Sequence, residues 1–186
     1  IRVEKDEQIA KGNFDKMKTL RPAFTKMGTV TAGNASSMSD GASAVVLSNR
    51  SKVEALGLKP LAAIVAYAEA EHEPTFFTTA PISATKRVLA NAGLTIADID
   101  LFEVNEAFAV VALAYQQELE IPLEKLNIKG GAVALGHALG SSGCRIVVTL
   151  VHALREQNKR YGLAAICNGG GGASAIIIEN EGYVKS

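Results

Sequence analysis

Apolar and polar positions divide the chain into a loosely patterned beginning and a regular remainder. The opening segment is rich in charge and shows no clear period. Residues 28–48 alternate turn-forming residues with small and β-branched ones, which predicts a glycine- and serine-rich loop leading into a buried strand at 42–47. A short helix is predicted next, with Ser48 or Asn49 as its cap and Gly57 as its end.

From Pro60 onward, strands and helices alternate, which predicts an α/β fold with a mixed sheet covered by helices. The predicted helix at 104–119 is apolar on nearly every side, so we expect it to be buried between layers. The helix at 141–158 is amphipathic, and the last two strands, joined by a glycine run, predict an antiparallel hairpin. The expected strands are 61–70, 99–104, 125–135, 163–167 and 173–179, and the remaining expected helix is 82–92.

Composition narrows the class of protein. The chain has 186 residues, of which 48% are hydrophobic and 20% charged, as is typical of globular proteins. Nineteen basic residues balance nineteen acidic ones, so net charge favours neither nucleic acid nor an anionic membrane surface as a partner. The apolar runs are too short to span a bilayer. Because the chain starts at Ile1 and not at methionine, we expect that a leader or a larger upstream segment has been removed.

The two cysteines, Cys144 and Cys167, argue against a disulfide scaffold and fit a reducing intracellular compartment. The expected location is cytoplasmic or mitochondrial. Their spacing from the three histidines matches no zinc pattern, so no structural metal site is expected.

Three predicted strands end in residues that could carry chemistry. Asn105 follows the strand at 99–104, His137 follows the one at 125–135, and Cys167 ends the one at 163–167. Each also has a purely structural alternative. Asn105 could cap a helix, His137 could be a hydrogen-bonded loop histidine, and Cys167 could be a small buried apolar residue.

Glycines favour the functional alternative. They surround His137 on both sides, and four in succession, 169–172, follow Cys167 closely. So much glycine is costly in backbone entropy unless a ligand or another backbone segment must approach closely. The loop GHALGSSG matches neither the dinucleotide nor the P-loop spacing and contains no lysine, so it is not expected to bind phosphate in either manner.

Three motifs resemble, in order and spacing, the C-terminal signature motifs of the thiolases. They are NEAFA at 105–109, GGAVALGHALGSSGCR at 130–145 and CNGGGGASA at 167–175. The segment at 29–47 also resembles the family's return from the loop domain to the N-terminal domain, so the similarity extends from about Leu20 to the end. It implies the C-terminal half of the five-layered thiolase fold. Residues 1–38 would end the loop domain, 39–59 would belong to the N-terminal domain, and 60–186 would form the C-terminal domain.

Within the family, the motifs look most like those of acetyl-CoA acetyltransferases. The resemblance implies Claisen condensation of two acetyl-CoA molecules to acetoacetyl-CoA and the reverse thiolysis, with coenzyme A thioesters as substrates and no tightly bound cofactor. Two alternatives stay open. One is a broad-range 3-ketoacyl-CoA thiolase of β-oxidation, and the other is a non-catalytic subunit that binds coenzyme A thioesters.

The resemblance also implies roles for individual residues. Cys167 would be the acid/base at the substrate α-carbon, which requires a thiol pKa lowered by nearby donors. His137 would activate the nucleophilic cysteine and donate to the thioester oxygen in one oxyanion hole, where Asn105 would fix a water. The backbone N–H of Gly169 would contribute to a second oxyanion hole. Ser36 would lie in the coenzyme A contact loop.

The chain departs from the family pattern in one decisive respect. The cysteine that thiolases acylate lies upstream of everything present here, and nothing in this chain matches its motif. Cys144 stands where the family usually has a small residue such as alanine, so it is not expected to be the nucleophile. We therefore expect a companion chain that carries the N-terminal half, an exposed apolar surface where that half packs, and assembly as a dimer or tetramer.

Smaller features bear on substrate and ions. Ala138 stands where most members of the family have proline after the histidine. Phe77 matches a position near the acyl pocket where some mitochondrial relatives also have phenylalanine, which suggests short-chain substrates and tolerance of a 2-methyl branch. Those relatives bind potassium through backbone carbonyls, so potassium is a candidate ion here. The matching residues are Ala32, Gly33, Ala35 and Val133.

Overall fold

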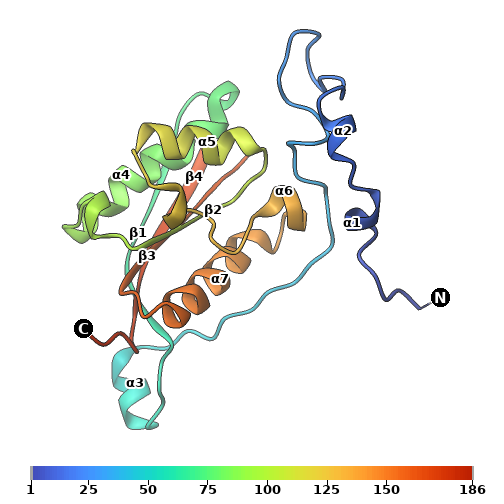
Figure 1. Ribbon diagram of the computed structural model, residues 1–186. Helices are drawn as coiled ribbons and strands as arrows, with labels where there is room; N and C mark the ends of the chain where they lie inside the picture. Colours follow the sequence, from blue (N-terminus) through green and yellow to red (C-terminus); the bar gives the residue numbers. More distant parts are fainter. Residues whose placement is uncertain (1, 186) are drawn as a thin grey trace.

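The computed structural model describes residues 2–185, which form an α/β body and a long N-terminal arm, residues 2–60 (Figure 1). The strands of the body are β1 Ala62–Glu71, β2 Leu101–Val104, β3 Tyr161–Cys167 and β4 Gly172–Asn180. Its helices are α4 Ala80–Ala92, α5 Ala109–Glu118, α6 Ala132–Leu135 and α7 Ser142–Glu156, with short 3-10 turns η1 Pro74–Thr79, η2 Ile96–Asp98 and η3 Leu123–Lys125.

The sheet is mixed, as the sequence predicts. Its strand order is β1-β4-β3-β2, and only β2 and β3 run parallel. The predicted hairpin is confirmed, because β3 and β4 pair antiparallel from Tyr161 opposite Glu179 to Cys167 opposite Ala173. The sheet therefore brings the ends of β2 and β3 to the same edge.

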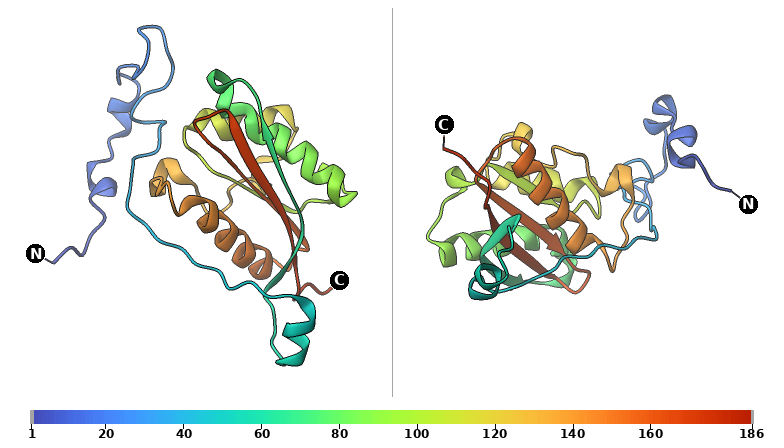
Figure 2. Two further views of the ribbon diagram at one scale, coloured as in Figure 1. Left: turned by 180° about the vertical axis from the view of Figure 1, so that it is seen from behind. Right: turned by 90° about the horizontal axis from the view of Figure 1, so that it is seen from below.

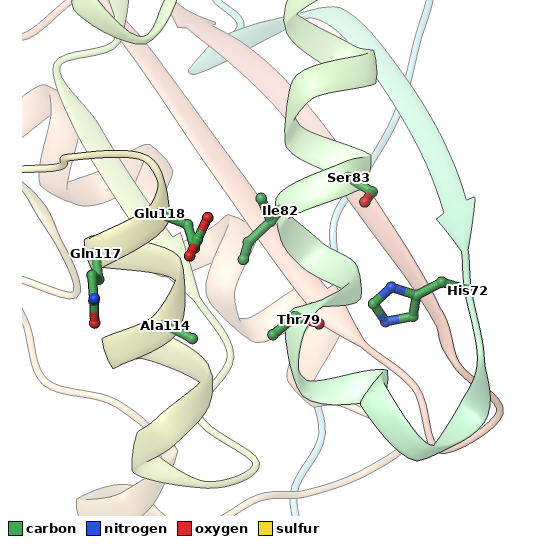
Figure 3. Close-up of a pocket in the computed structure, with 7 residues that line it drawn as sticks. All are labelled: His72, Thr79, Ile82, Ser83, Ala114, Gln117 and Glu118. Carbon is green, nitrogen blue, oxygen red and sulfur yellow. The ribbon is translucent and has the colours of Figure 1, made fainter.

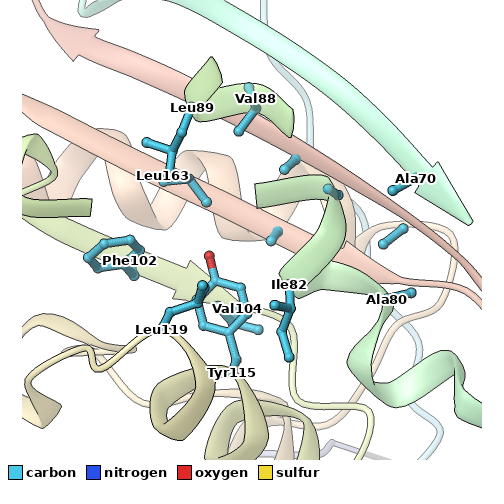
Figure 4. Packing of buried hydrophobic residues seen from close by; sticks show 14 of the residues in the cluster. Ala70, Ala80, Ile82, Val88, Leu89, Phe102, Val104, Tyr115, Leu119 and Leu163 are labelled. Carbon is cyan, nitrogen blue, oxygen red and sulfur yellow. The ribbon is translucent and has the colours of Figure 1, made fainter. Parts of the chain in front are cut away.

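Helices cover both faces of the sheet. α4 and α5 enclose one core, shown in Figure 4, in which Phe102, Tyr115 and Leu163 are almost fully buried. α7 encloses a second core with Leu101 and Leu150 on the opposite face. Because neighbouring strand residues point to opposite faces, Leu101 and Phe102 serve different cores. Each fully buried large apolar side chain contributes about 1.5–3 kcal/mol to the stability of the fold. The two cores therefore hold the ends of β2 and β3 in place.

Two predicted helices form much as expected. α4 ends at Gly93, whose φ of 65° is left-handed and suits glycine. α7 buries Ile146, Leu150 and Leu154 on one face, as the amphipathic pattern predicts.

The prediction for α5 is wrong in two respects. The helix begins at Ala109 and not at 104, and it is not buried on all sides, because Leu113 is 60% exposed. Val111 and Tyr115 are its buried residues. Within residues 2–185, α5 packs against the sheet with one face only, which leaves its other apolar residues at the surface.

The predicted strand at 125–135 is also wrong. After η3 the chain turns at Asn127, with φ 48°, and at Gly130, with φ 83°, and then forms α6. The backbone pairs with the outer edge of β2 only at one parallel bridge, between Leu126 and Phe102, and a side chain takes over at Val104. Asn127 Oδ1 accepts from Val104 N at 2.7 Å, and Asn127 Nδ2 donates to Val104 O at 2.9 Å. One amide thus satisfies both backbone groups that a neighbouring strand would have paired.

The predicted buried strand at 42–47 is the third error. The segment crosses the surface as part of the N-terminal arm (Figure 2), and Val46 is 98% exposed. No strand among residues 2–185 lies beside it to pair with its backbone, so this β-branched run lacks the partner that its composition requires. An exposed apolar surface was expected, and this run forms part of it.

The remainder of the arm contains short helices. α3 Arg50–Ala55 follows the prediction, since Asn49 Oδ1 caps it by accepting from Lys52 N at 2.9 Å and Gly57 has a left-handed φ of 61°. α1 Glu7–Lys11 and α2 Phe14–Met17 lie in the charged opening segment. No helix among the described residues is both long and apolar enough to cross a membrane.

Candidate active site

The site lies where β2 and β3 end together. Val104 and Ala165 are partners in the parallel ladder, and Asn105 N donates to Ala165 O at 3.0 Å. Asn105 therefore leaves the sheet beside the last residues of β3, which end at Cys167. The sequence correctly predicts that Asn105 follows one strand and that Cys167 ends another, and the structure shows that these strands are neighbours in the sheet.

His137 reaches this edge by another route than predicted, because it follows α6 and not a strand. The N-terminal arm holds its backbone: His137 N donates to Ser37 O at 2.7 Å, and His137 O accepts from Ser39 N at 3.3 Å. The arm segment that holds His137 thus lies about 100 positions before it in the sequence. Without residues 37–39 of the arm, the loop would lose both bonds.

The imidazole of His137 contacts a partner through each ring nitrogen. Nε2 lies 3.3 Å from Asn105 Nδ2, and Nδ1 lies 2.7 Å from Ser142 Oγ. Ser142 Oγ also donates to Ala138 O at 3.0 Å. A serine hydroxyl has one hydrogen, so all three contacts are satisfied together only when Nδ1 carries the imidazole proton and Nε2 accepts from Asn105.

His137 is neutral near neutral pH. Burial lowers its pKa below the usual histidine value, and the positive charge of Arg145 lowers the pKa further. Arg145 is placed close by because its Nη1 donates to Gly136 O at 2.9 Å, one residue before the histidine. A neutral imidazole with an unprotonated Nε2 is the form that can accept a proton from a thiol.

The thiol of Cys167 does not have the lowered pKa that a role as base requires. Burial in the first core raises its pKa above the usual cysteine value, and a backbone hydrogen bond offsets this only in part. The residue is only 9% exposed, so desolvation of a thiolate dominates. In this structure Cys167 is therefore a neutral thiol at neutral pH, a proton donor rather than a ready base.

The β3–β4 turn leaves one backbone donor uncommitted. Asn168 organises the turn: its Oδ1 accepts from Gly170 N at 3.0 Å and from Gly172 N at 3.2 Å, and its carbonyl accepts from Gly171 N at 3.3 Å. Among the described residues, Gly169 N–H makes no hydrogen bond, and a Cβ at Gly169 would meet nothing within 4 Å. The turn thus offers an open N–H two residues after Cys167.

One glycine of this run is required by packing. Gly171 has φ 87°, and a Cβ there would lie 2.2 Å from His72 O. The strand pair consequently approaches the end of β1 more closely than any side chain at this position would allow.

Ser36 and Phe77 both contact the NEAFA stretch. Ser36 Oγ donates to Ala107 O at 2.8 Å, and the rings of Phe77 and Phe108 meet edge to face with centroids 6.3 Å apart. A cavity of about 470 Å³ opens beside His137, between the arm and the loop that precedes α7. Its lining residues are Met38, Ser39, Asp40, Gly41, His137, Ala138, Leu139 and Gly140.

Sequence reasoning missed the residues that support these groups. Glu106 accepts from Asn127 Nδ2 at 2.8 Å and from Val133 N at 3.1 Å, and so ties the end of β2 to α6. Ser142 holds the imidazole from the first turn of α7. Its signal in the sequence is only a hydroxyl five positions after the histidine, at the start of an amphipathic helix.

Glu103 is a further buried group that sequence reasoning missed. Its signal in the sequence is a single carboxyl inside the apolar strand LFEV. It is only 4% exposed, and burial, reinforced by the charge of Glu106, raises its pKa to about 8 despite the opposing effect of Arg145. Glu103 Oε1 and Asn105 Oδ1 are buried without a hydrogen-bond partner among the described residues. Both belong to the end of β2.

A second cavity, of about 380 Å³, lies between α4, α5 and η1 (Figure 3), and no predicted site residue lines it. Across residues 2–185, no group of three or more His, Cys, Asp and Glu side chains is placed to hold a metal ion. Cys144 is half-buried on α7. These features add nothing to the chemistry at the end of β2 and β3.

Comparison with known proteins identifies the family. The family model for the C-terminal domain of thiolase matches residues 58–180, and the model for its N-terminal domain matches residues 1–51. The chain belongs to the thiolase family. The motifs that suggested this resemblance, at Asn105, His137 and Cys167, all lie within the C-terminal match.

Individual thiolases match closely. A probable acetyl-CoA acetyltransferase of Dictyostelium discoideum is 57% identical over 95% of this chain and 43% of its own length. The crystal structure of Acat5 thiolase from Ascaris suum in complex with coenzyme A matches with a TM-score of 0.85 and 47% identity, over 96% of this chain and 47% of that one. Human mitochondrial 3-ketoacyl-CoA thiolase in complex with CoA gives 0.88 and 43%, over 91% and 43%. The chain thus spans less than half the length of each of these relatives.

Proposed function

We propose that this chain supplies the second half of an acetyl-CoA acetyltransferase, which condenses two acetyl-CoA molecules to acetoacetyl-CoA and catalyses the reverse thiolysis. The observation that carries the proposal is the pair of His137 and Asn105, with Nε2 and Nδ2 3.3 Å apart, at the sheet edge where Cys167 ends β3. The acylated cysteine would come from an N-terminal thiolase half, either upstream sequence or a companion chain.

In the acylation step, His137 is the general base. Its unprotonated Nε2 takes the proton of the nucleophilic thiol, the thiolate attacks the acetyl carbonyl, and the bond from that carbon to the sulfur of coenzyme A breaks. The imidazolium then carries a proton on Nε2 that forms a hydrogen bond to the carbonyl oxygen and is transferred to the leaving thiolate as coenzyme A departs. The lowered pKa of His137 keeps the base form available near neutral pH.

In the carbon–carbon step, Cys167 exchanges a proton with the α-carbon. Condensation requires its thiolate, which takes a proton from the second acetyl-CoA, and the resulting carbanion attacks the enzyme-bound acetyl group and expels the nucleophilic cysteine. Thiolysis requires its thiol, which protonates the departing carbon. Because burial raises the pKa of Cys167, the thiol that thiolysis needs is the resting form at neutral pH, and the thiolate that condensation needs must be generated by loss of its proton.

Gly169 and the cavity beside His137 support substrate binding in this proposal. The uncommitted N–H of Gly169 is available as an oxyanion donor, and removing such a donor typically costs about 3 kcal/mol of transition-state stabilisation. The cavity would hold the thioester end of coenzyme A, and Ser36 and Phe77, which contact Ala107 and Phe108, are the further residues proposed to bind the ligand. Coenzyme A is bound in the Ascaris and human structures, which supports the same ligand class for this chain.

The proposal includes a potassium ion bound by backbone carbonyls. In the described structure, the four backbone carbonyls named for it accept no hydrogen bond, which leaves them free to contact a cation. Assembly as a dimer or tetramer, a cytoplasmic or mitochondrial location, and the domain boundaries after residues 38 and 59 likewise stay predictions.

A chimera tests the function most simply. The part of the Dictyostelium relative that precedes its match would be joined to residue 1 of this chain, and acetoacetyl-CoA formation and thiolysis would be assayed. We expect both activities, with thiolysis faster on short than on long 3-ketoacyl-CoA substrates. A preference for long chains would replace the assignment by a broad-range thiolase. Coenzyme A binding without either reaction would favour the non-catalytic subunit.

A further inference from the structure

Ser142 occupies the position from which the far side of the His137 ring is controlled. Its side chain is fully buried in the first turn of α7, and its hydroxyl lies between His137 Nδ1, at 2.7 Å, and Ala138 O, at 3.0 Å. Among the described residues, no other side chain forms a hydrogen bond with His137 Nδ1. Asn105, on the opposite side of the ring, approaches Nε2 only loosely at 3.3 Å.

Two proton arrangements are conceivable for this set of groups. With the proton on Nδ1, the ring donates to Ser142, Ser142 donates to Ala138 O, and Asn105 donates to Nε2, so three hydrogen bonds form. With the proton on Nε2, Ser142 must turn its single hydrogen to Nδ1 and gives up Ala138 O. Asn105 must then turn its amide to present Oδ1, so only two bonds form.

From this difference we infer that Ser142 is a positioning residue that holds His137 in the tautomer protonated on Nδ1, leaving Nε2 as the basic nitrogen. The inference deepens the proposed function and rests on it, because a base at Nε2 matters only if His137 accepts a thiol proton. Ser142 itself touches no reacting atom. It acts by deciding which ring nitrogen has the free electron pair.

Asn105 cannot enforce the tautomer alone. An amide offers a donor on one side and an acceptor on the other, so it can serve either form of Nε2 by turning over. The charged groups near the ring are Arg145 on α7, Asp40 in the adjoining cavity, and Glu103 and Glu106 at the end of β2. Arg145 disfavours the imidazolium but does not choose between the two neutral tautomers.

The intact chain provides a direct test and an internal reference. His72 Nε2 lies 2.6 Å from Phe76 O, and because a carbonyl only accepts, His72 must carry its proton on Nε2. Nitrogen-15 NMR of ring-labelled histidine distinguishes the tautomers by the shifts of the two ring nitrogens. With three histidines, each signal can be assigned from single His→Gln variants. We expect opposite tautomers for His72 and His137.

Two substitutions separate positioning from packing. Ser142→Ala removes the hydroxyl, and we expect the His137 signals to shift toward the tautomer protonated on Nε2 while the His72 signals stay unchanged. Ser142→Thr keeps a hydroxyl and should restore the Nδ1 form. Ser141→Ala is the matched control, since Ser141 bonds to Ser43 at 2.7 Å and not to the ring. If wild-type His137 carries its proton on Nε2, or if Ser142→Ala leaves its tautomer unchanged, the inference is overturned.

The same variants in the chimera connect the tautomer to catalysis. Ser142→Ala should lower the rate of acylation at saturating substrate by about 10- to 100-fold, less than the roughly 10²–10⁴-fold that a whole general base contributes. The KM should stay nearly unchanged. An inactive wild-type chimera would contradict the proposed function and leave the NMR result standing. A tautomer unaffected by Ser142→Ala in an active chimera would contradict the inference alone.

Discussion

Asn105 Nδ2 lies 3.3 Å from Nε2 of His137, although 32 positions separate the two residues. The contact forms because β2 delivers Asn105 to the sheet edge, while α6 and the N-terminal arm bring His137 over the same edge. It joins an amide to a neutral imidazole whose second nitrogen is already bound. This pair is the part of the chain on which the proposed acylation chemistry depends.

His137→Ala should slow acylation of the nucleophilic cysteine in the chimera by about 10²–10⁴-fold, the contribution typical of a general base. The measurement is the rate at which acetyl-CoA labels the protein in a single turnover. His152→Ala is the control, because His152 is exposed on α7. Acylation at the wild-type rate in His137→Ala would remove this residue from the role of activator.

Cys167→Ala should separate the two half-reactions. Because the proposal places the acetyl group on another cysteine, labelling by acetyl-CoA should persist, whereas acetoacetyl-CoA formation should be lost with the proposed proton carrier at the α-carbon. Cys144→Ala, on α7, should retain both activities. Product formation by Cys167→Ala would show that a different group moves this proton.

Glu103 should impose a pH dependence on stability. Its pKa is raised from 4.5 to about 8 in the folded chain, so the folded state binds a proton that the unfolded state has already lost. Its contribution to stability is complete below the unfolded value and is lost as pH rises through the folded pKa. Glu103→Gln cannot ionise, and it should be more stable than wild type at pH 8 but not at pH 4.

Urea denaturation across this range provides the measurement. Each unit of pKa shift corresponds to about 1.4 kcal/mol, so a gain of a few kcal/mol at the upper end is the expected scale. Glu124→Gln, an exposed glutamate, is the control and should follow wild type. A constant difference between Glu103→Gln and wild type at all pH values would mean that Glu103 does not carry this proton.

Asn127→Ala should destabilise the edge of the sheet. The amide satisfies Val104 N and Val104 O and also binds Glu106, and each buried group left unpaired costs about 1–3 kcal/mol. Urea denaturation should show a loss of this size. Asn91→Ala, on the exposed side of α4 with a bond of 3.4 Å to Tyr67 O, should change stability far less. Equal effects of the two substitutions would contradict the role given to Asn127.

Much of the body follows from local pattern. The strand before Asn105, the helix that ends at Gly93 and the hairpin around Gly169 could be predicted because periodicity, turn residues and caps agree there. The predicted placement of Asn105 and Cys167 at strand ends follows from the same pattern, whereas the pairing of these two strands is a finding of the structure. The roles of these residues come from the resemblance to thiolases and stay predictions until the variants are measured.

The errors have physical causes that no local pattern reveals. The pattern of residues 125–135 predicts a strand, but their backbone pairs with β2 only at Leu126. The chain then turns at Asn127, whose side chain occupies the edge of β2 at Val104. Residues 42–47 read as a buried strand, yet no partner lies beside them in the described structure. The pKa of Cys167 depends on how deeply β3 is buried, which glycine content alone could not predict.

The central claim is that this chain provides the acid/base half of a thiolase and that another segment provides the nucleophile. Brief exposure of the folded chimera to acetyl-CoA, followed by intact mass measurement and peptide mapping, tests it most directly. The account predicts one acetyl group, on a cysteine outside residues 1–186, and much slower labelling in the His137→Ala chimera. An acetyl group on Cys144 or Cys167, or none on a chimera that binds coenzyme A, would contradict it.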